Sequence, residues 1–186
     1  MRDTAESITK INDKLYLGGS HYMKGNHNTL LDQLEELGIN SIINVAGGID
    51  YPTTIRYRKF TWDDCNIPLF NFCKTNNVES NKTYPTVIEI ENYLNHEIKK
   101  GQVVYVHCRM GISRSATLVI FHYIKRYDMS FFQAYTTIKE LRASIRPNDH
   151  FTSQLMQYLQ RYRQQKYRTS RRAACRQISA LVTMTE

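Results

Sequence analysis

The sequence has no long hydrophobic run. No apolar stretch in its 186 residues approaches the roughly 20 residues that a helix needs to cross a bilayer. The first ten residues, MRDTAESITK, carry charges of both signs and no apolar core, so they do not resemble a secretory signal. We therefore expect a cytoplasmic or nuclear protein.

Cysteine is scarce, and its spacing is not that of a disulfide framework or a zinc site. The four cysteines include no CxxC pair and no Cys/His cluster with zinc-ligand spacing. Cys65, Cys73 and Cys175 have no neighbours that would activate a thiol, and we expect them to be free and unreactive. Cys108 stands in a different context, described below.

Positive charge is concentrated in one segment. The net charge of +8 arises mostly from RYRQQKYRTSRRAACR, residues 161–176, which holds six arginines, one lysine and no acidic residue. Apolar spacing also fades beyond about residue 163. We therefore predict a folded domain over residues 1–163, with the functional residues in it, and a basic C-terminal tail over residues 164–186, flexible or conditionally helical.

Strand and helix patterns alternate in the first half of the chain, and helices dominate the second. Strands are predicted over 15–19, 41–46, 55–62 and 102–107. A polar loop is predicted between the third of these strands and about Lys82. Helices are predicted from Asn28 as cap to Gly38, from Thr83 and Pro85 to Gly101, and over 115–127, 130–145 and 149–162. This order predicts a single α/β domain with a mainly parallel central sheet flanked by helices.

One stretch, VVYVHCRMGISRSA at residues 103–116, joins a β-branched strand to a loop and then a helix. A strand–loop–helix turn directs several backbone N–H groups into one small space, and the helix N-terminus adds positive potential there. Gly111 lets the loop bend closely around a ligand. Arg114 supplies a planar fork of donors for two phosphate oxygens. The stretch therefore predicts a cradle for a tetrahedral phosphate dianion.

Cys108 lies at the foot of this cradle, where positive potential favours its thiolate form. A thiolate facing bound phosphorus can attack in line and form a phosphocysteine, while Arg114 and the loop amides hold the equatorial oxygens. We expect His107 to orient the loop and tune the thiol, and Ser115 to donate a hydrogen bond that helps Cys108 leave. Because these groups do the work of a metal, we expect neither metal nor cofactor.

The peptide HCRMGISRSAT resembles the active-site signature of the dual-specificity phosphatases, within the protein tyrosine phosphatase superfamily. Three further segments resemble the family in the same order: ITKINDKLYLGG, its opening strand; LEELGINSIINVA, a helix and the second strand; and LRASIRPNDHFTSQL, the approach to its last helix. The resemblance covers about residues 8–162. It implies the phosphatase fold and hydrolysis of phosphotyrosine and phosphoserine or phosphothreonine in proteins.

The family's general acid is an aspartate on a loop some tens of residues before the signature. Here FTWDDCNIPLF holds Asp63 and Asp64, and placing the family's apolar triplet on residues 60–62 puts the acid at Asp64. Asp63 is the alternative, and a third reading makes both aspartates solvated loop carboxylates. The family's proline precedes the acid, whereas Pro68 follows it here, so the register of the loop stays open.

The resemblance also sets expectations about substrate. A chain of this length has no room for the extra recognition loop of tyrosine-specific relatives, so a shallow cleft with dual specificity is expected. Arg109, Met110, Gly111, Ile112 and Ser113 are the expected substrate-binding residues. Arg109 would favour acidic or doubly phosphorylated phosphoproteins, such as a doubly phosphorylated kinase, although it can equally be a solvated surface charge.

Two other functions are consistent with parts of the sequence. The first is the same chemistry on RNA 5′-phosphates or phosphoinositides, because arginines interleaved with Tyr162 and Tyr167 can bind a phosphate backbone and stack on bases. The second is a non-catalytic phosphoprotein-binding module, which the presence of both Cys108 and Arg114 disfavours. The basic tail itself could contact RNA, an anionic membrane or a second subunit, or be a solvated extension.

Overall fold

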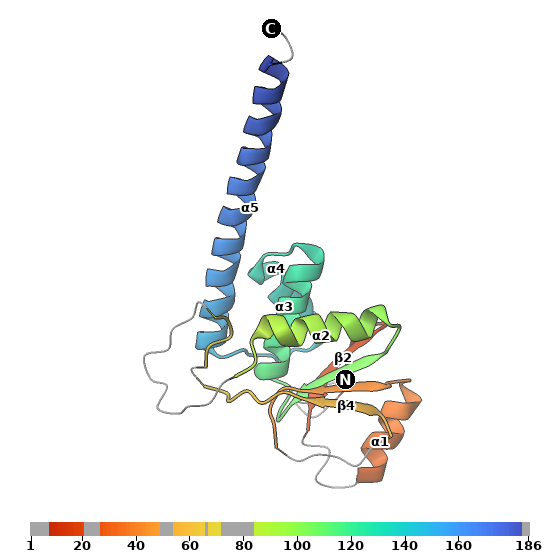
Figure 1. Cartoon of the computed structure of the whole chain (residues 1–186). Helices are drawn as coiled ribbons and strands as arrows, with labels where there is room; N and C mark the ends of the chain where they lie inside the picture. The colour runs from red at the N-terminus through yellow and green to blue at the C-terminus, as the bar shows by residue number, and fades with distance from the viewer. Residues whose placement is uncertain (1–7, 21–26, 49–53, 66, 72–83, 184–186) are drawn as a thin grey trace.

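The fold consists of five strands and five helices in the part of the chain that the computed structural model describes, residues 8–20, 27–48, 54–65, 67–71 and 84–183 (Figure 1). In chain order the elements are β1 (Thr9–Asn12), β2 (Leu15–Gly19), α1 (His27–Glu36), β3 (Ser41–Asn44), β4 (Arg56–Lys59), α2 (Val87–Lys99), β5 (Val104–Cys108), α3 (Arg114–Tyr127), α4 (Phe131–Leu141) and α5 (Asp149–Thr183).

The strands form one sheet in the order β1-β2-β5-β3-β4. Strand β5 lies at its centre, parallel to both neighbours, and Val106 sits opposite Leu17 of β2 and Ile43 of β3. Only β1 runs antiparallel, as a hairpin with β2. The mainly parallel α/β architecture predicted from the sequence is confirmed, with one strand, β1, that the sequence pattern did not separate from β2.

Side chains alternate across the sheet and so build two cores. Val104 and Val106 of β5 point into the larger core, which α2, α3, α4 and the start of α5 complete. Tyr105, between them, points to the opposite face, where Leu34 of α1 covers it. Figure 1 shows the same division, with α1 on one side of the sheet and α2 and α3 on the other. The carboxyl end of β5 thus emerges between two covered faces.

Several helix boundaries differ from the predicted ones. Helix α2 starts after Thr86, whose hydroxyl accepts a hydrogen bond from the Glu89 N–H in a capping box, and not at Thr83. Helix α1 begins at His27, so Asn28 lies in its first turn instead of capping it. Residues 66 and 72–82 of the expected loop, Thr83 itself and the side chain of Asn28 fall outside the described residues.

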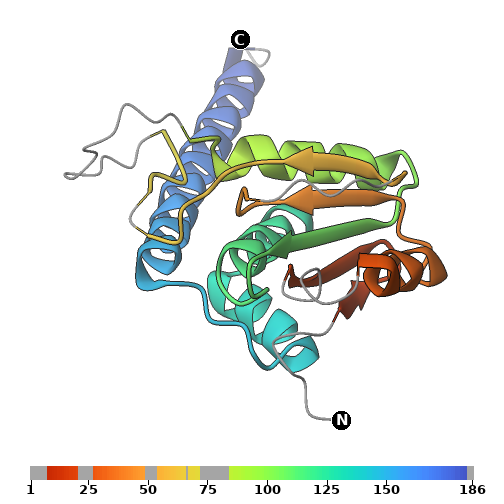
Figure 2. The same cartoon turned by 90° about the horizontal axis from the view of Figure 1, so that it is seen from below.

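Helix α4 was predicted to reach residue 145 but ends at Leu141. Its start follows the prediction, because Ser130 caps it in a second capping box with Gln133. At Arg142 the backbone turns to extended geometry, φ −136° and ψ 93°. The segment that follows crosses beneath the start of α3 and the loop after β5 (Figure 2). Helix α4 ends early because residues in the segment 142–148 hydrogen bond the carbonyls of the loop after β5.

Helix α5 runs for 35 residues and passes the predicted domain boundary at residue 163 without a break. Phe151, Leu155 and Leu159 bury its first part in the core. Every residue from 161 to 176 is exposed, and this part of the helix rises away from the domain (Figure 1). Within the described residues, no helix combines the length and the apolarity that crossing a membrane would need.

Candidate active site

The loop after β5 closes around the sulfur of Cys108. The Gly111 N–H and the Ser115 hydroxyl each donate a hydrogen bond to Sγ, both at 3.2 Å. Cys108 is only 2% exposed, and α3 begins at Arg114, directly after the loop. Two donors and a helix N-terminus on one sulfur form an arrangement that stabilises negative charge there.

A pocket of about 680 Å³ opens above this sulfur. Of the residues singled out in the sequence it is lined by Asp64, Cys108, Arg109, Met110, Ile112, Ser113 and Arg114. The segment before α5 completes it with Arg146, Pro147, Asn148 and Asp149, none of which the sequence reasoning had named as site residues. Gly111 and Ser115 lie beneath the sulfur, and His107 is buried behind the loop.

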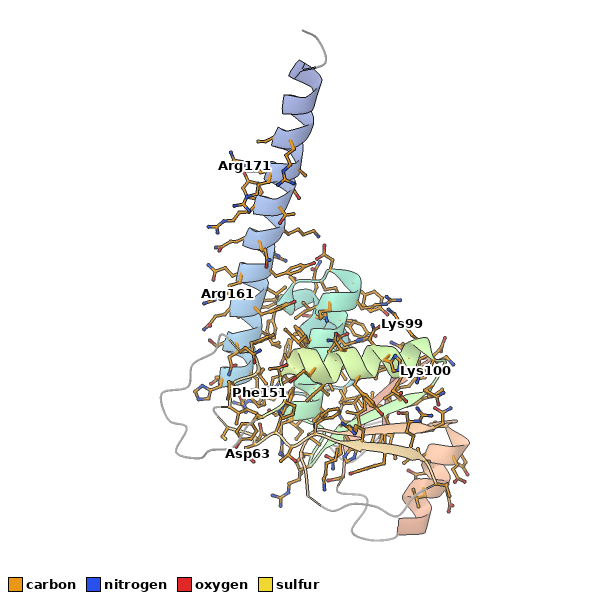
Figure 3. The ribbon with its side chains drawn as sticks, in the orientation of Figure 1. Asp63, Lys99, Lys100, Phe151, Arg161 and Arg171 are labelled. Atoms are coloured by element: carbon orange, nitrogen blue, oxygen red, sulfur yellow. The ribbon has the colours of Figure 1, made fainter. Side chains whose placement is uncertain are left out.

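The two candidate acids occupy different surroundings. Asp64 lines the pocket, where its Oδ1 accepts hydrogen bonds from the Ser113 hydroxyl at 2.7 Å and from the Asn148 side-chain amide at 2.9 Å. Its Oδ2 lies 3.8 Å from Arg114 Nε. Asp63 instead accepts a hydrogen bond from the Tyr84 hydroxyl. Figure 3 labels Asp63, which lies near the start of α5.

The loop that carries the acid is fixed to the domain at several points. Trp62 is fully buried, its indole N–H donates to the Pro85 carbonyl at 2.8 Å, and its own carbonyl accepts from Arg114 Nη1 at 3.0 Å. Further along, the Gln154 side chain of α5 hydrogen bonds the Leu69 N–H at 2.7 Å. The buried indole therefore holds the loop so that the carboxylate two residues later faces the phosphate cradle.

Comparison with known proteins agrees with this geometry. Residues 21–161 match the sequence profile described as dual specificity phosphatase, catalytic domain. The chain belongs to the dual-specificity phosphatase family.

Two curated relatives and one solved structure illustrate the similarity. Protein phosphatase Slingshot of Drosophila melanogaster is 34% identical over 156 residues, which are 82% of this chain and 13% of that protein. A probable rhodanese domain-containing dual specificity protein phosphatase of Dictyostelium discoideum is 36% identical over 152 residues, 81% of this chain and 28% of that protein. The chain thus spans less than a third of the length of either relative.

The human tyrosine phosphatase-like serine/threonine/tyrosine-interacting protein superposes with a TM-score of 0.65 at 22% identity, covering 83% of this chain and 97% of that one. This likeness shows that the dual-specificity phosphatase fold is shared.

The loop after β5 turns its carbonyl groups outward into buried protein. Ser20 N–H donates to the carbonyls of Cys108 and Arg109, at 2.8 and 3.0 Å, and the Arg146 N–H donates to that of Ile112 at 2.8 Å. A further partner is Arg142, a fully buried side chain that was not predicted from the sequence as a site residue.

Arg142 joins three parts of the phosphatase domain. Its Nε donates to the Gly111 carbonyl at 3.0 Å, Nη2 reaches the Met110 carbonyl at 3.5 Å, and Nη1 donates to the Thr9 hydroxyl at 2.8 Å. The residue lies in the segment 141–155 that resembles the family, but the helical pattern there had assigned it to a helix.

The loop also approaches β2 so closely that neither side tolerates a Cβ. Gly111 has a φ of +69°, and a Cβ on it would come within 2.4 Å of the Gly18 backbone. A Cβ on Gly19 would lie 2.7 Å from the Met110 carbonyl carbon. The glycines that end β2 are therefore part of the site, and not only the end of a strand.

His107 acts on the backbone of the loop. Its Nδ1 lies 3.3 Å from the Cys108 carbonyl oxygen, and its ring stacks on that of Tyr105 with centroids 5.4 Å apart. Burial lowers the pKa of His107 from 6.5 to about 4, although the hydrogen bond to the Cys108 carbonyl opposes the shift. The ring is therefore neutral at neutral pH and unsuited to proton transfer there.

Neither Cys65 nor Cys175 is among the residues that line the pocket above Cys108. Cys65 and Cys175 are exposed free thiols, as predicted, whereas Cys73 falls outside the described residues. In the described part of the chain, no cluster of three or more His, Cys, Asp or Glu residues is placed to hold a metal ion.

We predict that Arg142→Met destabilises the domain by about 3 kcal/mol, because the buried carbonyls of Gly111 and Met110 lose charged donors that water cannot replace. Urea unfolding monitored by circular dichroism measures this loss. The matched control is Arg126→Met, which removes an exposed arginine. Equal stability of the two variants would show that the loop finds other donors.

We predict that neutral His107 makes stability depend on pH. The unfolded chain protonates this residue near pH 6.5 and the folded chain only near 4, so its contribution is complete above 6.5 and is lost as pH falls toward 4. The loss amounts to about 3 kcal/mol. The free energy of unfolding of His107→Asn should therefore fall less over this range than that of the wild type. A matched variant of the exposed His150, His150→Asn, should keep the wild-type slope; a wild-type slope in His107→Asn would contradict the prediction.

Proposed function

We propose that this chain is a phosphatase that hydrolyses phosphotyrosine and phosphoserine or phosphothreonine in proteins through a phosphocysteine intermediate. One observation carries the proposal. Cys108, which accepts two hydrogen bonds at its sulfur, lies at the floor of a pocket that also contains Arg114 and Asp64. Membership of the dual-specificity phosphatase family supports the same reading.

In the first step the Cys108 thiolate attacks the phosphorus of the bound phosphoryl group. The bond from phosphorus to the substrate oxygen breaks on the opposite side, and Asp64 gives that oxygen its proton, so the product is a neutral alcohol or phenol. Arg114 suits the equatorial oxygens, because its Nε is buried and has no hydrogen-bond partner within the described residues.

In the second step a water molecule attacks the phosphocysteine. Asp64, now ionised, accepts a proton from the water, and the sulfur–phosphorus bond breaks to release inorganic phosphate. The Ser115 hydroxyl, 3.2 Å from Sγ, stabilises the departing thiolate. The cycle returns Asp64 to its protonated form and Cys108 to its ionised form.

The rim of the pocket suits acidic phosphoproteins. Arg109 and Arg146 are both exposed and line the pocket on two different segments, one in the loop and one before α5. Two cations beside the phosphate site attract a second negative charge on the substrate, such as the second phosphate of a doubly phosphorylated kinase. A cytoplasmic or nuclear location accords with such substrates.

We predict cysteine-dependent phosphate release from phosphotyrosine and phosphothreonine peptides in metal-free buffer, because the thiolate and Arg114 supply nucleophile and charge stabilisation. The measurement is the initial rate of wild type and Cys108→Ser on both peptides, a doubly phosphorylated kinase loop, a 5′-triphosphorylated RNA and a phosphoinositide. The variant should lose about a thousandfold or more. Preferential release from RNA or lipid would keep the mechanism and change the substrate class; no release at all would favour a phosphoprotein-binding module.

We predict that Asp64→Asn lowers kcat on a phosphothreonine peptide by about a hundredfold or more, because an alkoxide leaves poorly without a proton. On an aryl phosphate with an activated leaving group the loss should be much smaller, since the phenolate leaves unaided. Asp63→Asn is the matched control and should change neither rate more than about threefold. The opposite ranking of the two variants would move the acid role to Asp63.

A further inference from the structure

A second hollow lies between the first turn of α4 and the middle of α5, which pack against each other (Figure 1). We call it the α4–α5 groove. Its volume is about 430 Å³, within the range of about 300–1,000 Å³ that is typical of ligand sites. Its apolar lining comes from Phe131, Phe132, Met156 and Leu159, and Arg163 lines it on the side away from the start of α5.

Two side chains of the groove expose an unusual amount of apolar surface. Phe132 is 74% exposed, more than any other large hydrophobic side chain in the described residues, and Met156 is 52% exposed. Because they belong to one groove, they form a patch, which indicates a binding surface better than single scattered residues do. The capping box of Ser130 and Gln133 holds the first turn of α4 in place, while the thioether of Met156 adapts to what it contacts.

A line of basic residues continues from the groove along α5. Arg163, Tyr167 and Arg171 recur at intervals of four residues, and Met156 lies seven residues before Arg163. These side chains therefore follow one side of the helix. The Arg171 guanidinium lies over the Tyr167 ring, 5.9 Å from its centroid, on the part of α5 that extends past α4 (Figure 3). Neither Arg163 nor Arg171 forms an ion pair with a described residue, and residues 161–176 contain no carboxylate.

The order of these features distinguishes between classes of partner. A nucleic acid would satisfy the arginines but has no aliphatic side chain for the wall at Met156 and Leu159. A membrane surface needs a continuous apolar face, and beyond Met156 this side of α5 is polar and basic. A second copy bound through the same patch would bring its own arginines against Arg163 and Arg171.

We propose that the α4–α5 groove and the arginines beyond it bind an acidic segment of a protein partner. One bulky apolar side chain of that segment enters the groove between Phe132 and Met156, where it covers exposed apolar surface. Carboxylates that follow it lie along α5 and pair with Arg163 and Arg171. The apolar contact supplies affinity, and the charges select acidic segments over basic ones.

The groove lies on the same side of α5 as the catalytic pocket. Asp149 lines that pocket, and Met156 follows it by seven residues, which is about 10 Å along the helix. An extended chain spans such a distance with about three residues. A phosphoprotein held in the groove therefore keeps its phosphorylated residue near Cys108 at a high effective concentration. This use of the groove rests on the proposed function, whereas binding of the segment does not require Cys108.

The first test is fluorescence anisotropy with the full chain and labelled, unphosphorylated peptides of about twelve residues, long enough to span the groove and the arginines. Two peptides place a leucine and a phenylalanine before or after a run of glutamates. Two comparison peptides replace the apolar pair by serines or the glutamates by lysines. One of the first two should bind at least about tenfold more tightly than either comparison peptide.

The apolar part of the groove is tested with Phe132→Gln/Met156→Gln. Its matched control, Leu37→Gln/Leu141→Gln, removes two other exposed apolar side chains that do not line the groove. The groove variant should bind the preferred peptide about tenfold more weakly, and the control should bind within about twofold of the wild type. Both variants change exposed positions, so their thermal unfolding midpoints should stay within about 3 °C of the wild type.

The charges are tested with Arg163→Gln/Arg171→Gln. The matched control is Lys99→Gln/Lys100→Gln, which removes two exposed cations on and just after α2 (Figure 3). The arginine variant should bind about fivefold more weakly at low salt, and its affinity should depend less on salt than that of the wild type. The lysine control should keep both the affinity and the salt dependence.

A kinetic measurement then examines the link to the catalytic pocket. Joining the preferred peptide to a phosphothreonine segment should lower KM about tenfold without changing kcat, and Phe132→Gln/Met156→Gln should abolish this gain. Rates on a small aryl phosphate should be equal in all these variants. Peptide binding without any turnover would contradict the proposed function and support the groove. Turnover without the gain in KM would overturn substrate docking.

Three results would overturn the α4–α5 groove as a binding site. The first is that neither acidic peptide binds. The second is equal weakening in a variant and its matched control, which would assign binding to general stickiness or to net charge. The third is tighter binding to a single-stranded RNA or to phosphatidylserine vesicles than to the peptides.

Discussion

The loop after β5 points its backbone amides into the site and its carbonyls outward. The site depends on hydrogen-bond donors that satisfy those outward carbonyls. A phosphate cradle uses its N–H groups for the ligand, so its carbonyls face protein and must find donors there. The donors come from three distant segments: Ser20 after β2, Arg142 at the end of α4, and the Arg146 backbone before α5. Arg142 also donates to the Thr9 hydroxyl, 133 residues away in the sequence, so these contacts tie both ends of the domain to the loop.

This constraint explains why the fold has its observed form around β5. The strand must end beside the glycines of β2, because a side chain at Gly19 would collide with the loop. Helix α4 must end early, because Arg142 has to leave it to reach the Gly111 carbonyl. The segment before α5 must then pass under the loop, which brings Asn148 and Arg146 to the pocket.

The parts of the site that could be predicted from the sequence are local. Cys108, Arg114 and Ser115 lie within one strand–loop–helix turn, whose geometry follows from neighbouring residues. Asp64 could be proposed only through the family resemblance, because its position depends on the burial of Trp62 in a distant core. Its surroundings in the structure match the proposal, although its role as an acid stays a prediction.

The residues that the sequence did not reveal act over long distances. Arg142 and Asn148 carry no local signal of function, since an arginine near a helix end and an asparagine before a helix are common on solvent-exposed surfaces. The helical spacing of apolar residues in the sequence continues past Leu141. In the structure, hydrogen bonds to the loop after β5 outweigh helix propensity there. Likewise, the second strand of the β1–β2 hairpin was predicted, while the turn that separates the two strands was not.

The side-chain amide of Asn148 links the start of α5 to Asp64 in the loop that precedes it in the pocket. Its side-chain oxygen accepts a hydrogen bond from the Phe151 N–H at 2.9 Å and so caps α5, while its nitrogen donates to Asp64. The amide therefore has one permitted orientation, and a rotation by half a turn would break both contacts. Asparagine carries its carbonyl acceptor and its N–H donors on separate atoms of one short, rigid group, so its shape makes the start of α5 and the carboxylate of Asp64 a single mechanical unit.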